Sequence, residues 1–130
     1  MKRYLLFLLI PIIFSVTSCT KTQNVVPNQT ILTSINSSNW TTSDGGKTYS
    51  AVINMPEINN SFNNYGGVLA YVTYDNATYI QIPEVFGGLT FSYTHNIGQI
   101  QIDVQASNGV SIISNPGNLG VKIVLIPSSY

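Results

Sequence analysis

The sequence predicts an all-β protein built as an antiparallel β-sandwich. From residue 31 onward, apolar and polar residues alternate with a period of two, which is the pattern of strands that bury one face. No stretch of ten or more residues in this region has the 3.6-residue period of an amphipathic helix. Clusters of glycine, asparagine and serine, such as "SDGGK" and "NPGNLG", separate the alternating stretches and are typical of turns.

The first 18 residues have the layout of a secretory signal. Lys2 and Arg3 form a short basic head, and an apolar run from Leu5 to Phe14 follows, interrupted only by Pro11. A helix that spans a bilayer needs about 20 apolar residues, and this run is roughly half as long. We therefore expect residues 1–18 to be a cleaved signal peptide rather than a permanent membrane span.

Cys19 is the only cysteine of the chain. Together with the preceding Val16, Thr17 and Ser18 it resembles a bacterial lipobox, the sequence at which a lipoprotein signal peptidase cuts. Since no second cysteine exists to form a disulfide, a lipidated thiol is favoured over a buried or paired one. We expect a thioether-linked diacylglycerol and an N-linked acyl chain such as palmitate on Cys19, anchoring the mature chain to a membrane. No other cofactor is expected.

Cleavage before Cys19 would leave a weakly acidic chain. Three lysines then face five acidic residues, for a formal charge of −2. No basic patch remains to neutralise phosphates, which argues against nucleic-acid binding. Residues 19–30 are polar and lack periodicity, so we interpret them as the lipidated cysteine and a flexible tether. Residues 31–130 are long enough for a single domain with one modest core.

Seven stretches of the domain are expected to form strands. Each is rich in β-branched or aromatic residues and lies between turn-forming clusters. In chain order the expected strands are 31–36, 48–55, 68–74, 78–82, 89–95, 99–105 and 121–126. The last stretch, "VKIVLIP", is apolar at nearly every position, as expected of a central strand that is buried on both faces.

The first hairpin is expected to turn at Asp75 and Asn76. A two-residue turn there would place Leu69 opposite Ile82 and Tyr71 opposite Ile80, gathering one apolar face. The other face would be only half polar and would carry the following residues: Val72, Tyr74, Tyr79 and Gln81.

The second hairpin is expected to turn at Ile97 and Gly98. A three-residue loop would instead shift the pairing by one residue and place acids and amides opposite aromatic rings. Because such a shift inverts the faces of a strand, we reject the register with the three-residue loop. The preferred register gives these pairs: His95 with Ile100, Tyr93 with Ile102, Phe91 with Val104, and Leu89 with Ala106. A sheet with one apolar face needs a cover, and without helices the usual cover is a second sheet. We expect immunoglobulin-like or Greek-key connections.

The sequence offers little support for catalysis. Glu57 and Glu84 lie in similar motifs, "NMPEI" and "QIPEV", and would suit a small polysaccharide hydrolase only if they faced each other across roughly 5–10 Å. His95 is expected at the rim of the sandwich rather than as a general base. No metal site is expected, because "SDGGK" around Asp44 and "YDNAT" around Asp75 are better explained as turns.

Aromatic residues give the one positive indication of binding. The chain has eight tyrosines, five phenylalanines and one tryptophan, Trp40, which we expect in the core. Four aromatics in turns or on the half-polar face could contact a glycan or a protein partner, and the candidates are Phe62, Tyr65, Tyr74 and Tyr79. The alternative for Tyr74 and Tyr79 is packing under the second sheet.

The chain resembles small uncharacterised lipoproteins of Bacteroidetes-type Gram-negative bacteria. The resemblance is carried by "TSC", the "W" of Trp40, "YSAVINMPEI", "GGVLAYV", "YIQIP", "LTFSY", "GQIQIDV" and "VKIVLIP". Many such proteins carry charged or Gly-Pro-rich residues after the cysteine, where this chain has "TKTQNVVPNQT". Acidic residues there are associated with transport to the cell surface, so the sequence does not decide which face of the outer membrane the protein occupies. The resemblance implies the compartment and the fold, but it does not imply any particular activity.

Together these patterns predict a protein that is lipid-anchored in the outer membrane, on its periplasmic or its outer face. We expect the domain to be a non-catalytic binding or structural module of the cell envelope. Its expected partners are the membrane itself and a glycan or an envelope protein.

Overall fold

The computed structural model describes residues 25–128. The predicted signal peptide, Val16, Thr17, Ser18 and the predicted lipidation site Cys19 lie outside the described residues, as does most of the predicted tether.

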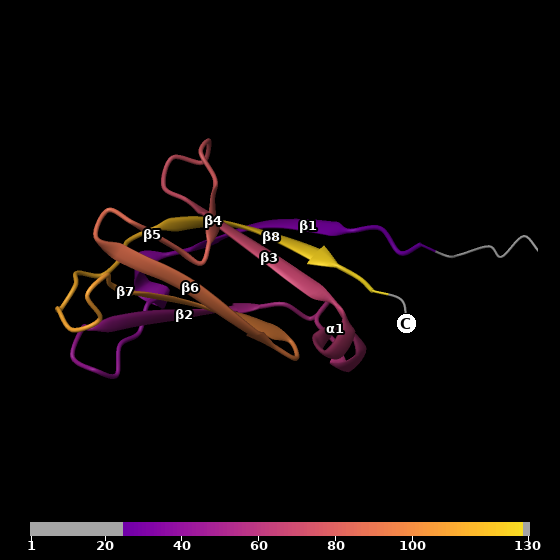
Figure 1. Ribbon diagram of the computed structural model, residues 1–130, viewed down its shortest axis with the longest axis horizontal. Coiled ribbons are helices and arrows are strands. Elements are labelled where there is room, and N and C mark those ends of the chain that lie inside the picture. Colours follow the sequence, from indigo (N-terminus) through magenta and orange to yellow (C-terminus); the bar gives the residue numbers. More distant parts are fainter. Residues whose placement is uncertain (1–24, 129–130) are drawn as a thin grey trace, which may run out of the picture.

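The described chain folds into two antiparallel four-stranded sheets that pack face to face as a β-sandwich (Figure 1). Sheet A has the order β1-β8-β3-β4, and sheet B has the order β2-β7-β6-β5. Sheet A consists of β1 (Gln29–Ile35), β8 (Leu119–Ile126), β3 (Gly67–Thr73) and β4 (Ile80–Ile82). Sheet B consists of β2 (Thr48–Asn54), β7 (Gln99–Ala106), β6 (Leu89–Asn96) and β5 (Glu84–Phe86). A short helix α1 (Asn60–Tyr65) and a 3₁₀ turn η2 (Ser37–Asn39) complete the domain.

All seven expected strands are present, with bounds that agree to within two residues. β1 begins at Gln29, so regular structure starts inside the segment expected to be tether. Two elements were not expected. α1 lies in the asparagine-rich segment interpreted as a turn, where the side chain of Asn59 caps the helix by accepting a hydrogen bond from the Phe62 amide at 2.9 Å. β5 has three residues and pairs with β6 across Gly87 and Gly88, which both have positive φ.

The strand order differs from the immunoglobulin order that was one of the two expectations. In an immunoglobulin sandwich the first two strands are neighbours in one sheet. Here β1 pairs with the last strand, β8, while β2 belongs to the other sheet and pairs with β7. Between β2 and β5 the chain forms β3 and β4 of sheet A. It then re-enters sheet B and forms the three hairpin-linked strands β5, β6 and β7, the last of which lies beside β2.

A single hydrophobic core lies between the sheets. β8 buries alternate residues, from Leu119 to Leu125, and β7 buries Ile100, Ile102 and Val104. Trp40 is buried as expected, and its indole N–H donates to the Gly117 carbonyl at 2.7 Å. The central position expected for β8 is confirmed, but its outer face is half-buried rather than fully buried.

The register of the second hairpin is confirmed. His95 lies opposite Ile100, Tyr93 opposite Ile102, and Phe91 opposite Val104. Phe91, Ile100, Ile102 and Val104 are fully buried, because this register brings the apolar residues of β6 and β7 to the same face.

The expected register of the first hairpin is wrong by one residue. Ala70 lies opposite Ile82, and Val72 lies opposite Ile80, so Tyr71 faces outward beside Gln81. The connection between β3 and β4 is longer than a two-residue turn and comprises residues 74–79. Within it, the Asp75 carboxylate accepts hydrogen bonds from the amides of Ala77 and Thr78. β3 is apolar on both faces, so its sequence pattern did not determine which face points inward.

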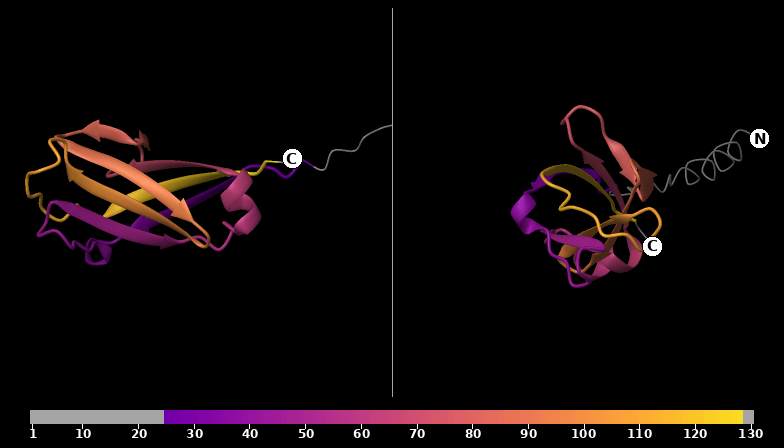
Figure 2. Two further views of the ribbon diagram at one scale, coloured as in Figure 1. Left: turned by 60° about the horizontal axis from the view of Figure 1, so that its bottom comes forward. Right: turned by 90° about the vertical axis from the view of Figure 1, so that its left-hand side faces the viewer.

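The two ends of the sandwich differ in the segments they carry (Figure 2). We call one end the tether pole, because the chain enters the domain there; it comprises residues 25–28, the segment 55–66 with α1, the turn 97–98 and residues 127–128. We call the other end the distal pole; it comprises the connections 36–47, 74–79, 87–88 and 107–118. Strands of eight residues separate the poles by about 26 Å.

Replacing Gly120 with alanine should destabilise the fold. A Cβ at this position of β8 would lie 2.6 Å from Cγ2 of Thr73 and 2.9 Å from Oδ1 of Asn76. Because Thr73 is buried, we expect Gly120→Ala to lower the free energy of unfolding by about 1–3 kcal/mol in a urea titration. Gly67→Ala is the matched control in the neighbouring strand, since its Cβ would meet only Ile126 at 3.8 Å. Equal losses in both variants would contradict this account.

Candidate functional site

The outer face of sheet A carries a row of side chains that spans all four strands. Leu32 of β1 lies opposite Lys122 of β8, Lys122 opposite Tyr71 of β3, and Tyr71 opposite Gln81 of β4. We call these four residues the outer row. Leu32 is 67% exposed, which is high for a leucine on a regular strand.

The ammonium group of Lys122 lies over two tyrosine rings. Nζ of Lys122 lies 4.4 Å from the ring centre of Tyr71 and 4.2 Å from that of Tyr79. Both distances are within the range of a cation–π interaction. The lysine is thereby held against the sheet, and the two rings form a half-exposed aromatic platform beside it.

The outer faces of the two sheets differ in polarity. Around the outer row, sheet A presents further partly exposed apolar side chains, namely Leu69, Val124 and Ile126. The corresponding face of sheet B is formed by hydroxyl, amide and carboxylate groups of Ser50, Thr94, Gln101 and Asp103, with Val52 as an apolar exception. Ser50 and Gln101 both donate hydrogen bonds to the Asp103 carboxylate. Of the two faces, sheet A has the composition of a contact surface.

The four aromatics expected to bind a ligand do not form one site. Tyr79 lies beside the outer row, and Tyr71, which was expected on the core face, joins it there. Tyr74 is 52% exposed and packs edge-on against the buried Phe91, with ring centres 6.5 Å apart. Burial raises the pKa of Tyr74. Phe62 and Tyr65 lie on α1 at the tether pole, so the set is divided between three places.

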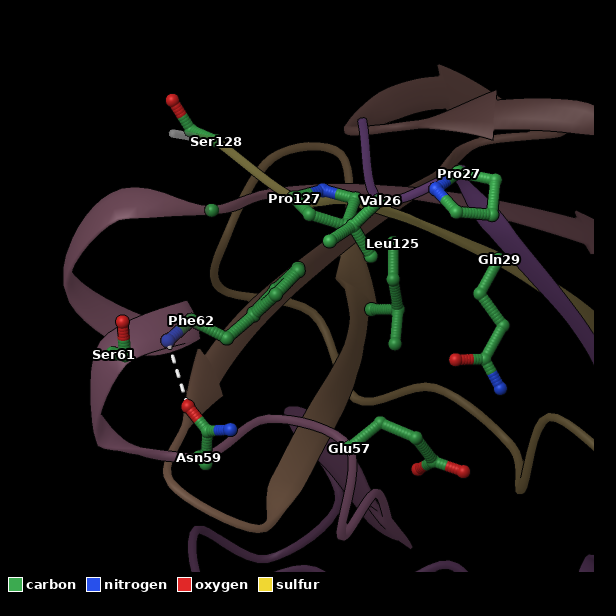
Figure 3. A pocket seen from close by; sticks show the side chains of 11 residues that line it. Val26, Pro27, Gln29, Glu57, Asn59, Ser61, Phe62, Leu125, Pro127 and Ser128 are labelled. Carbon is green, nitrogen blue, oxygen red and sulfur yellow. Dashed lines mark hydrogen bonds between the residues drawn. The ribbon is translucent and has the colours of Figure 1, made fainter. Parts of the chain in front are cut away.

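Phe62 lines a groove of about 360 Å³ at the tether pole (Figure 3). The groove lies between α1, the arriving segment with Val26 and Pro27, and the departing segment with Leu125 and Pro127. The Phe62 ring points toward Val26, Pro127 and Leu125. It also fills the space beside Gly66, where a Cβ would approach the ring to 2.7 Å. The groove therefore has an apolar wall that α1 holds in place.

The opposite wall of the groove is polar. Glu57 and Gln29 turn their polar ends toward the same side of the groove (Figure 3). Asn59, which also lines the groove, uses its side-chain oxygen to cap α1. A single carboxylate beside an amide offers hydrogen-bond acceptors to a ligand but lacks the second acid that hydrolysis would need.

Glu57 lies at the tether pole, whereas Glu84 lies in β5, toward the distal pole. Glu84 pairs with Phe91, which precedes Gly98 by seven residues along β6 and its turn. Gly98 in turn donates to the carbonyl of Ile58, next to Glu57, at 2.8 Å. The five extended steps from Phe91 to Asn96, the last residue of β6, alone span about 16 Å, which exceeds the roughly 10 Å limit for a pair of catalytic carboxylates. The two glutamates therefore cannot act on one glycosidic bond.

Asp44 and Asp75 each bind their own loop. The Asp44 carboxylate accepts from the amides of Thr48 and Lys47 and from the Thr42 hydroxyl, and these bonds lower its pKa from 3.8 to about 2. The amides of Thr78 and Ala77 and the Thr73 hydroxyl likewise hold the pKa of Asp75 far below 3.8. Both segments are turns, as expected. Within residues 25–128, no three His, Cys, Asp or Glu side chains gather as a metal site would require.

His95 lies at the tether end of β6, as expected of a rim position. Its Nδ1 is 3.1 Å from Oδ1 of Asn63 on α1, so the ring links the second hairpin to the helix. The partner is an amide rather than an acid, which is the arrangement of a structural contact and not of a general base with its orienting carboxylate.

The two loop aspartates should make the fold sensitive to acid. Because their pKa values are lower in the folded state, the stability they contribute is present above about pH 4 and is lost as the pH falls toward 2. An Asp44→Asn and Asp75→Asn double variant keeps an oxygen acceptor in each turn but removes the titration. We expect its urea midpoint to vary less than that of the wild type between pH 4.5 and 2. Parallel curves for the two proteins would contradict this expectation.

Comparison of the chain with protein-family models, curated proteins and solved structures finds no match. Among residues 25–128, no helix has the length and hydropathy needed to cross a bilayer. The assignment of function therefore depends on the lipobox-like segment and on the surfaces described above.

Proposed function

We propose that this protein is a lipid-anchored module of the cell envelope, and that it binds a partner through the outer face of sheet A. The anchor is the lipid on Cys19, and the membrane is the outer membrane. The partner is a glycan or another envelope protein, and the domain performs no catalysis.

The outer row is the observation that carries the binding role. A partner that covered Leu32, Tyr71 and Tyr79 would bury apolar and aromatic surface, which is the main source of binding energy at protein contacts. Lys122 would supply a single charge that is already positioned by the two rings, so little side-chain entropy would be lost when an acidic or hydroxyl group binds it.

The anchor is supported by the distance in sequence between Cys19 and the domain. The first described residue, Val25, follows the cysteine by six residues. The lipobox-like segment therefore precedes a domain that has its own core, which is the order that a secreted, anchored module requires. The hydrolase considered from the sequence loses its basis, because its two carboxylates are far apart.

Replacing Cys19 with alanine should abolish membrane anchoring. When the full-length chain is expressed in a Gram-negative host with labelled palmitate, we expect the wild type to take up label and to sediment with membranes. The Cys19→Ala variant should take up no label and should accumulate as an unprocessed or soluble form. Ser15→Ala, four residues upstream of the cysteine, is a control that leaves the thiol in place. Equal labelling and sedimentation of wild type and Cys19→Ala would overturn the anchor.

The partner should crosslink to sheet A rather than to sheet B. A photoreactive p-benzoyl-phenylalanine at Leu32 lies in the outer row, and the same group at Val52 lies on the outer face of sheet B at a comparable exposure of 56%. In irradiated cells we expect a specific higher-mass adduct from position 32 and none from position 52. Identical adduct patterns from both positions, or no adduct from position 32, would contradict the proposal.

A further inference from the structure

The tether pole presents exposed apolar side chains from three separate segments. Val25 and Val26 of the arriving chain are 79% and 64% exposed. Ile97 in the turn between β6 and β7 is 54% exposed, and Tyr65 at the end of α1 is 51% exposed. These segments are distant in sequence but lie at the same end of the sandwich (Figures 1 and 2).

This pole is almost free of charge. In the segments 25–31, 54–68, 95–100 and 125–128, Glu57 is the only aspartate, glutamate, lysine or arginine. The distal pole, in contrast, carries Asp44, Lys47 and Asp75. The polar groups of the tether pole are mostly asparagine amides, which can exchange hydrogen bonds with water or lipid head groups at a small desolvation cost compared with a charge.

The apolar side chains at the tether pole are held in place by the fold. The Gly98 amide donates to the Ile58 carbonyl, and the Met55 amide donates to the Gly98 carbonyl, each at 2.8 Å. Met55 and Ile58 are buried, so these bonds tie the turn that carries Ile97 to the core. Tyr65 ends a helix whose last turn is closed by a 2.7 Å bond from the Gly66 amide to the Phe62 carbonyl.

The length of chain between Cys19 and Val25 restricts what can lie against this pole. Six residues span at most about 22 Å, whatever their conformation. The strands of the sandwich are about 26 Å long, so a lipid on Cys19 keeps the tether pole within about 22 Å of the bilayer surface, whereas the distal pole can lie farther away. The nearest surface that the exposed apolar groups can meet is then the membrane that holds the lipid.

We propose that the tether pole rests on the head-group layer of that membrane, with Ile97, Tyr65 and Val26 inserted at the boundary with the acyl chains. This inference depends on the proposed lipid anchor and adds an orientation to it. Tyrosine is enriched at membrane interfaces, and apolar groups of interfacial proteins enter this boundary by about 5–10 Å. The sandwich then stands upright, with the outer row on its side and the loops of the distal pole directed away from the lipid.

Site-specific fluorescence quenching tests the orientation. The lipidated protein has no free thiol once Cys19 carries its thioether, so an added cysteine can be labelled alone. Ile97→Cys and Tyr65→Cys report on the tether pole. Val110→Cys and Ile112→Cys are matched controls in the connection 107–118 at the distal pole. The native side chains at these positions are 68% and 72% exposed. Each labelled protein is reconstituted into vesicles of phosphatidylethanolamine and phosphatidylglycerol, with and without a lipid that carries a nitroxide near its head group.

We expect the nitroxide lipid to remove at least about half of the fluorescence at positions 97 and 65, and less than about a tenth at positions 110 and 112. Equal quenching at both poles would overturn the upright orientation. A label at position 97 that is shielded from iodide in water but not quenched by the nitroxide lipid would show that a protein or a second copy covers the pole instead. Failure of the wild-type protein to float with the vesicles would reject the lipid anchor itself, and the orientation with it.

Discussion

The contact between the inner faces of β7 and β8 is the constraint on which the rest of the structure depends. Each strand is central in its sheet, and each buries every second side chain in the common core. Once Leu119, Val121 and Ile123 point inward, the residues between them must point outward. Lys122 is therefore placed on the outer face, where its neighbours on β1 and β3 and the ring of Tyr79 flank it.

The same alternation gives the two outer faces their different characters. β6 and β7 put hydroxyl, amide and carboxylate groups between their core residues, so sheet B meets water. β1, β3 and β8 put leucine, tyrosine, valine and isoleucine there, so sheet A has an apolar outer face crossed by the outer row. Exposed apolar faces of this kind often mark contact surfaces, and this asymmetry is the physical basis for proposing that sheet A carries the binding role.

The directions of the strands bring the two ends of the described chain together. β1 leaves the tether pole and β8 returns to it, so Val26 and Pro27 before β1 and Pro127 after β8 flank the same groove beside α1 (Figure 3). The groove is thus formed by the two ends of the domain and by Phe62, and it lies on the side that would face the lipid. In the proposed upright orientation the outer row lies on the side wall of the sandwich, where a neighbouring molecule could reach it.

The sequence by itself determined the fold class, the positions of seven strands and the register of the second hairpin. The reason is that period-two alternation can be read within each strand, and that shifting the hairpin by one residue would turn its apolar side chains to the wrong face. It also supplied the lipobox-like segment before Cys19, which lies outside the described residues. Only the tertiary structure decided which face of β3 is buried, because that strand is apolar on both faces and the loop around Asp75 sets its pairing with β4. α1 has a single apolar anchor in six residues, and β5 has only three residues, so neither is long enough to show a period. The outer row and the separation of Glu57 from Glu84 depend on strand order, which arises from contacts between residues far apart in the chain.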